Sequence, residues 1–236
     1  MNPPPISDLW VFLKAKPLLW LVLTLGAWVL ARRLQEAAGG AAWANPVAGA
    51  SVMLGLILWL TDTPYAEFFA GAQFVHFLLG PATIALGVTI IEHGAAVRRQ
   101  LVPVAGALLV GVVMSVGCTW ALCRVARLPN EITLSLLPKS ATAPVAMAVS
   151  ESIGGIASIS MCAVLLTGVT GAVIVTPLFN LLRFRNWNAR GFAAGLTAHG
   201  IGTARAYQVG NEVGVYAALA LALAALLQGI VLPLVL

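Results

Sequence analysis

The chain has 236 residues, of which 60% are hydrophobic and only 9% are charged. An ordinary soluble domain carries about 25% charged residues, so a water-soluble globule of this size is excluded. The net charge of +5 does not indicate nucleic-acid binding, because the basic residues lie in small clusters at the ends of apolar segments rather than along one stripe.

Eight apolar segments follow one another along the chain, separated by charged or turn-forming residues. They cover residues 17–34, 46–60, 68–91, 101–123, 132–150, 155–182, 191–211 and 213–236. Several exceed the roughly 18 apolar residues typical of a membrane-spanning helix. The sequence therefore predicts an all-α integral membrane protein with about seven or eight transmembrane or re-entrant helices. We expect one polytopic domain over residues 1–236, crossing the bilayer of the cell (inner or cytoplasmic) membrane several times.

Three of these segments contain residues that interrupt helices. Proline removes a backbone hydrogen bond, and glycine permits a break or a close backbone approach. The interrupting residues are Pro81 in the third segment, Pro138 and Pro144 in the fifth, and Gly200 and Gly202 in the seventh. These three segments are candidates for broken or re-entrant helices. The distribution of Lys and Arg leaves open whether residues 132–150 and 191–211 span the membrane or re-enter it.

The residues around Pro81 resemble those around Pro144. An inverted repeat, which is common in transporters, would produce such a similarity. Chance would also produce it in a chain so rich in alanine, and both explanations stay open.

The fifth segment places a cation and two hydroxyls between its prolines, namely Lys139, Ser140 and Thr142. A carboxylate would find there a positive charge, hydroxyl donors and the positive end of a helix. The alternative is that Lys139 extends to the membrane interface while the hydroxyls bond to their own helix.

The seventh segment carries His199 and Thr203, which are four residues apart and share one face of a helix. Arg205 follows and could pair with an anion, with Glu212 or with Glu151. A lone histidine is often only a packing residue, but its position beside an arginine in an otherwise uncharged segment favours a functional role.

The third segment contains Gln73 and His76, three residues apart, and Thr83 just after the predicted break. Binding and packing roles are equally consistent with these residues. The chain contains no GxSxG, HExxH or paired-carboxylate motif, so the sequence predicts no enzyme, no metal site and no cofactor.

Three stretches resemble motifs of the LrgB/CidB family. They are PKSATAPVAM with SESIGG at 138–147 and 150–155, QFVHFLLGPAT at 73–83, and AHGIGTARA at 198–206. The resemblance begins near residue 18 and covers nearly the whole chain. It implies one of two functions. One is transport of small carboxylates, such as pyruvate-type acids in bacteria and glycolate and glycerate in the related plastid translocator. The other is a holin/antiholin-like pore or regulator of murein hydrolase export and lysis.

Both functions imply a smaller LrgA/CidA-type membrane partner, here a separate chain, and we expect a homo-oligomer. Convergent buried donors favour the secondary transporter of pyruvate, lactate, glycolate or glycerate. Its carboxylate would be held by Lys139 and Arg205. The remaining substrate contacts would come from Ser140, Thr142, Thr203, Gln73 and Thr83. The groups expected to carry a coupled proton are His199, His76 and Glu151.

Overall fold

The computed structural model describes residues 16–41, 43–78 and 100–236 and the single positions 81, 88, 91 and 98. Regular structure within this part of the chain is entirely helical, which confirms the all-α class. The helices are α2 (Pro17–Ala37), α3 (Pro46–Leu60), α4 (Tyr65–Phe77), α7 (Leu101–Val125), α8 (Asn130–Leu136), α9 (Ala143–Ser152), α10 (Ala157–Leu181), α11 (Trp187–Val209) and α12 (Asn211–Val235).

Four of the described helices, α2, α7, α10 and α12, are long and apolar enough to cross a membrane. The three longest have 25 residues each, or about 37 Å at the helical rise, against a hydrocarbon core of about 30 Å. The described residues thus support a helical membrane protein with four candidate membrane-spanning helices, whereas the predicted total of seven or eight segments stays a prediction.

The chain divides into two compact units, residues 1–85 and 86–236. In the first unit, α2 begins at Pro17, a residue whose fixed φ suits the first turn of a helix. Its small residues Ala27 and Ala31 pack against Ala50 of α3. The buried Trp20 lies edge-on to Phe68 of α4, with ring centroids 5.9 Å apart. The prediction of a single membrane domain is not tested by this division.

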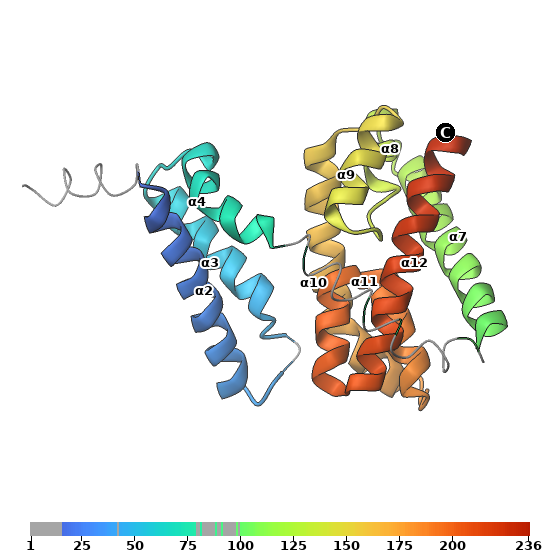
Figure 1. Cartoon of the computed structure of the whole chain (residues 1–236). Helices are drawn as coiled ribbons and strands as arrows, with labels where there is room; N and C mark the ends of the chain where they lie inside the picture. Colours follow the sequence, from blue (N-terminus) through green and yellow to red (C-terminus); the bar gives the residue numbers. More distant parts are fainter. Residues whose placement is uncertain are drawn as a thin grey trace, which may run out of the picture. The chain divides into compact units, whose positions relative to one another are not determined.

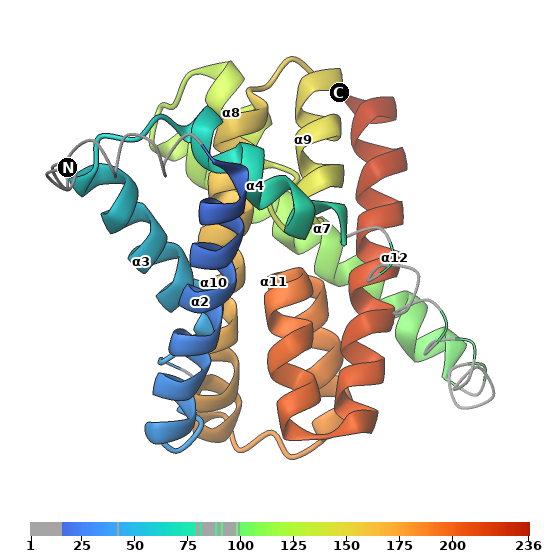
Figure 2. The same ribbon diagram turned by 60° about the vertical axis from the view of Figure 1, so that its left-hand side comes forward.

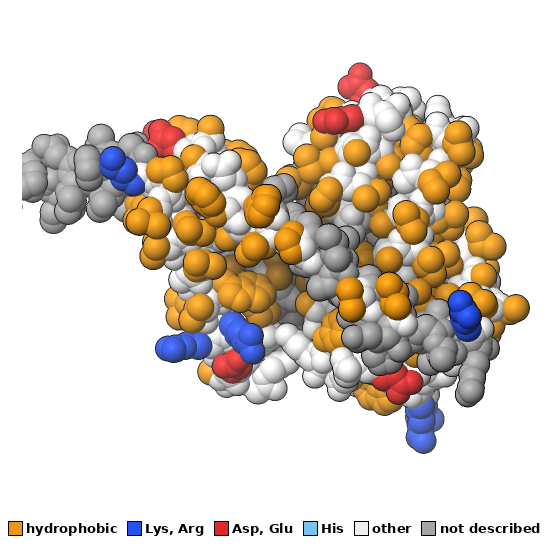
Figure 3. All heavy atoms as spheres, in the orientation of Figure 1, with side chains coloured by type: hydrophobic (Ala, Val, Ile, Leu, Met, Phe, Trp, Pro, Cys, Tyr) orange, Lys and Arg blue, Asp and Glu red, His pale blue; other side chains and the backbone are white. Residues whose placement is uncertain are grey.

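One face of each unit is rich in apolar side chains between its charged ends. In Figure 3 hydrophobic side chains are spread over the middle of this face, and the acidic and basic side chains lie towards its ends. Along α7, Val102, Val113 and Leu122 are 84%, 66% and 69% exposed. An apolar surface of this extent is expected to face lipid rather than water.

The second unit is built around the long helices α7, α10 and α12. Figures 1 and 2 show α9 and α11 between α10 and α12, with α9 towards one end of these long helices and α11 towards the other. The remaining helices form two hairpins. The first hairpin consists of α8 and α9, and the second consists of the two arms of α11, which lie before and after a break at Ala198 and His199.

The first hairpin folds back between its two helices. Leu137, just after α8, packs with Val149 near the end of α9. Its base is fixed at the start of α10, because Ser135 Oγ accepts from the Ile156 backbone N–H at 2.7 Å and Ser160 Oγ donates to Ser135 O at 2.7 Å. The fifth segment of the sequence is therefore interrupted, as predicted, and both of its ends lie at the same end of α10.

The second hairpin is formed because α11 reverses direction at Ala198 and His199, where φ and ψ are non-helical; His199 has φ 37° and ψ −130°. Gly202 of the second arm lies against the backbone of Ala194 in the first arm. At the base, Asn188 Nδ2 donates to Glu212 Oε1 at 2.8 Å, which joins the start of α11 to the start of α12. The interruption predicted in the seventh segment is thus present immediately before Gly200.

The first arm of α11 packs on α12 through a glycine, and this contact gives a stability prediction. A methyl group added at Gly195 would overlap the backbone of Ala217. We expect Gly195→Ala to lower the free energy of unfolding by about 1–3 kcal/mol, the cost of overpacking a close contact. Thermal unfolding of the detergent-solubilised protein measures this. Gly117→Ala in α7, where nothing lies within 4 Å of the added carbon, is the matched control and should have little effect.

Candidate functional site

The tips of the two hairpins meet on the same stretch of α10. The Val164 side chain packs with Ala141 and Ala146 of the first hairpin. The Val164 carbonyl bonds to His199 Nε2 of the second hairpin at 2.8 Å. Gly168, one turn further along α10, leaves room for the His199 ring, which any side chain at that position would overlap. Since these residues lie in the interior of α10, the tips meet well inside the length of a helix that is long and apolar enough to cross a membrane.

Each hairpin begins a helix at its tip. α9 begins at Ala143, and the second arm of α11 begins after the break at His199. The first backbone N–H groups of a helix have no acceptor within it, and they carry a positive partial charge. Two such positive ends are therefore directed to the same region of α10, an arrangement that favours an anion.

The tip of the first hairpin holds the predicted polar residues. Pro138 and Ser140 are buried, and Lys139 and Thr142 are half-buried. Ser140 Oγ lies 2.7 Å from Ser115 Oγ of α7, so one hydroxyl donates to the other. This contact fixes the tip against α7.

Pro144 occupies the first turn of α9 rather than the interruption itself. Proline fits there because the first amides of a helix need no acceptor. The interruption extends from Leu137 to Thr142, before this proline.

The tip of the second hairpin is organised by His199, which is buried. A carbonyl oxygen only accepts hydrogen bonds, so the contact with Val164 requires that Nε2 carry the proton. Nδ1 is then the nitrogen that can take up and release a proton. Thr203 Oγ1 donates to His199 O at 2.8 Å, so its hydroxyl hydrogen is used within the hairpin and its oxygen remains an acceptor.

The described acidic residues of the second unit are Glu131, Glu151 and Glu212, and all three are exposed. Glu131 lies at the start of α8, Glu151 at the end of α9 and Glu212 at the start of α12. These positions are at the bases of the hairpins. Among the described residues, the tips thus combine the ammonium of Lys139 with no carboxylate, and Glu151 is not placed beside His199.

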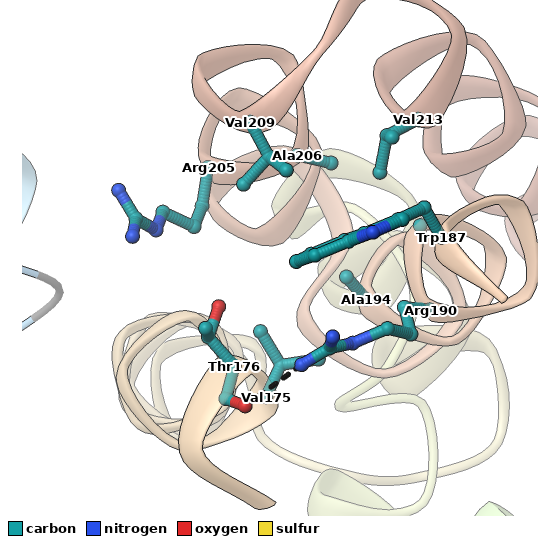
Figure 4. Close-up of a pocket in the computed structure, with 10 residues that line it drawn as sticks. Val175, Thr176, Trp187, Arg190, Ala194, Arg205, Ala206, Val209 and Val213 are labelled. Atoms are coloured by element: carbon teal, nitrogen blue, oxygen red, sulfur yellow. Dashed lines mark hydrogen bonds between the residues drawn. The ribbon is translucent and has the colours of Figure 1, made fainter. Parts of the chain in front are cut away.

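Arg205 lies in the second arm of α11 and lines a pocket away from the first hairpin. Figure 4 shows its side chain on the opposite side of this pocket from Trp187. Its Nη1 donates to Gln208 Oε1 at 3.0 Å. The lining of this pocket does not include Lys139. This pocket therefore does not bring together the two cations that were predicted to share one carboxylate.

Arg190, a basic residue at the end of an apolar segment, lines the same pocket and is only 6% exposed. Its Nη2 donates to Thr176 O at 2.9 Å and to Asn180 Oδ1 at 2.6 Å, and its guanidinium lies over the Trp187 ring at 4.1 Å (Figure 4). Position in the first turn of a helix beside a tryptophan does not distinguish a buried arginine from a surface one.

The predicted residues of the third segment belong to the first unit. Gln73 is exposed on α4, and its Nε2 donates to Ala70 O at 2.8 Å. Pro81 is exposed, and α4 includes His76. The side chain of His76 and the whole of Thr83 lie outside the described part of the protein.

The chain matches the model of the LrgB-like family over residues 24–236. It is similar to two proteins of Bacillus subtilis (strain 168). "Uncharacterized protein YxaC" is 30% identical over 191 residues, which are 80% of this chain and 83% of the relative. "Uncharacterized protein YwbG" is 30% identical over 177 residues, which are 75% and 78% of the two chains. No solved structure matches the chain.

Proposed function

Because this chain belongs to the LrgB-like family, we propose that it is a secondary carrier of small monocarboxylates of the pyruvate, lactate, glycolate and glycerate class. The observation that carries the proposal is the meeting of two hairpin tips on α10, each with a helix beginning at the tip. Transporters use such interrupted helices near the middle of the bilayer to bind substrate.

The carboxylate would be bound where these helices begin. The first N–H groups of α9 and of the second arm of α11 would donate to its oxygens, and the ammonium of Lys139 would compensate its charge. Ser140 and Thr142 would contact the keto or hydroxyl oxygen, and Thr203 would offer an acceptor. Arg205 would attract the anion towards the second hairpin rather than hold it at the tips.

Alternating access would follow from the separate bases of the two hairpins. The first hairpin is anchored at the beginning of α10 and the second at its end. Movement of one hairpin would expose the substrate to one side of the membrane, and movement of the other to the opposite side. His199 would carry the coupled proton at Nδ1, and its hydrogen bond to Val164 would hold the second hairpin closed.

As a carrier, the protein would not be an enzyme and would need no cofactor. It would reside in the inner or cytoplasmic membrane as a homo-oligomer, with a small LrgA/CidA-like membrane protein as its partner.

Uptake into proteoliposomes tests the proposal. We expect the purified chain to take up at least one of labelled pyruvate, lactate, glycolate or glycerate in a saturable manner, with competition by the other acids. Vesicles without protein are the control. Unsaturable uptake together with leakage of unrelated dyes would contradict the carrier and favour the lysis-related pore.

A further inference from the structure

Residues 217–236, which include most of α12, contain a single polar side chain, that of Gln228. Its side chain is completely buried. Neither Nε2 nor Oε1 has a hydrogen-bond partner among the residues that the structure describes. A buried amide without partners lowers the stability of a protein and is uncommon, so we expect a polar group to bind this side chain.

The neighbouring turns of α12 place Gln228 between the two hairpins. Ala224, one turn before it, belongs to a cluster with Leu196 of the second hairpin. Leu232, one turn after it, belongs to a cluster with Leu137 of the first hairpin. Since positions four apart share one face of a helix, the amide lies on the inward face of α12, at the level between these clusters.

The contacts of α7 place Gln228 at the same depth along the long helices by a separate argument. Val116 packs against both of these clusters. The residue before it, Ser115, bonds to Ser140 at the tip of the first hairpin. The amide of Gln228 is therefore at the depth of the hairpin tips, where the proposed carboxylate site lies.

We propose that Gln228 is a substrate-binding residue that contacts the oxygen on carbon 2 of the acid. This inference rests on the proposed function. The carboxamide N–H donates to a keto or hydroxyl oxygen, and the carboxamide oxygen accepts from a hydroxyl. A 2-hydroxy acid satisfies both amide groups and a 2-keto acid satisfies only the donor. Gln228 thus favours 2-hydroxy acids over 2-keto acids of the same size.

The test compares wild type with Gln228→Leu. We expect the KM for lactate uptake to rise by roughly 10-fold, as for the loss of one or two hydrogen bonds, and the KM for pyruvate, the keto acid of the same size, to rise less. Lactate should raise the unfolding temperature of wild type but not of the variant. Without ligand, the variant should be at least as stable as wild type, because it no longer buries an unpaired amide.

Thr133→Val is the control, because Thr133 is also buried but its hydroxyl donates to the Pro129 carbonyl at 3.1 Å. It should leave both KM values unchanged. If Gln228→Leu is not recovered folded, Gln228→Met keeps the length of the side chain and gives the same comparison.

Two outcomes overturn the assignment, and they are distinguishable. An unchanged KM and unchanged stabilisation by lactate in the Gln228 variant reject the role of Gln228 and leave the carrier intact. A wild-type protein that neither transports nor is stabilised by any of the acids rejects the proposed function, and the role of Gln228 with it.

Discussion

Lys139→Met is expected to lower carboxylate uptake by roughly 10- to 100-fold, since a hydrogen bond to a charged group contributes about 1.5–3 kcal/mol. Lys139 is the cation at the first tip, and the described acids of the second unit lie at the hairpin bases. Methionine keeps the length of the side chain and removes the charge. Initial rates of uptake into proteoliposomes, normalised to inserted protein, measure the effect.

Lys16→Met is the matched control, because Lys16 is exposed and precedes α2. It should leave uptake unchanged. If Lys139→Met inserts normally and transports at the wild-type rate, the carboxylate is not held at the first hairpin.

His199→Gln is expected to abolish the stimulation of uptake by a proton gradient while exchange of substrate across the membrane continues. The glutamine amide can still donate to the Val164 carbonyl, as His199 Nε2 does at 2.8 Å. It has no group corresponding to Nδ1, so it cannot bind and release a proton near neutral pH. Uptake with and without an imposed pH gradient, in wild type and variant, gives the comparison.

His199→Leu separates the two roles of this residue. Leucine removes both the hydrogen bond and the titratable nitrogen, so exchange should also fall, because the second tip is no longer held against α10. Gradient-stimulated uptake that survives in His199→Gln would show that the proton is carried by another group.

Much of this architecture was predictable from the positions of a few residues. The long uncharged segments indicated membrane helices, and α7, α10 and α12 follow them closely. Pro138 indicated the interruption between α8 and α9, because proline removes a backbone hydrogen bond and clashes with the preceding turn of a helix. Within lipid, the backbone groups left without partners must be bonded by other parts of the protein. The glycines at 200 and 202 indicated a break in the seventh segment, which lies at the adjacent Ala198 and His199.

The reversal of α11 was not predictable, because it depends on the positive φ of His199. A histidine rarely adopts this conformation, and neither its own type nor the following glycine fixes the direction of the second arm. The same reversal brings Arg205 into the pocket that Arg190 lines. The grouping of Lys139 with Arg205, which lie in the fifth and seventh segments, stays a prediction.

Ser115 and Gln228 were missed for a different reason. Each is a polar residue with apolar neighbours on both sides in a long apolar helix, and it forms no motif with the residues around it. Their significance depends on what faces them, which is Ser140 for Ser115 and the level of the two tips for Gln228. The rarity of polar side chains in membrane helices was the one signal in the sequence that pointed to them.

Counterflow in proteoliposomes tests the carrier most directly. Vesicles containing wild-type protein are loaded with unlabelled acid and diluted into a trace of the same acid with a label. A carrier that alternates between two sides exchanges the two pools, so labelled acid should accumulate transiently above its external concentration. Equilibration without any such accumulation, at a rate shared by unrelated small anions, would contradict the account and indicate a pore.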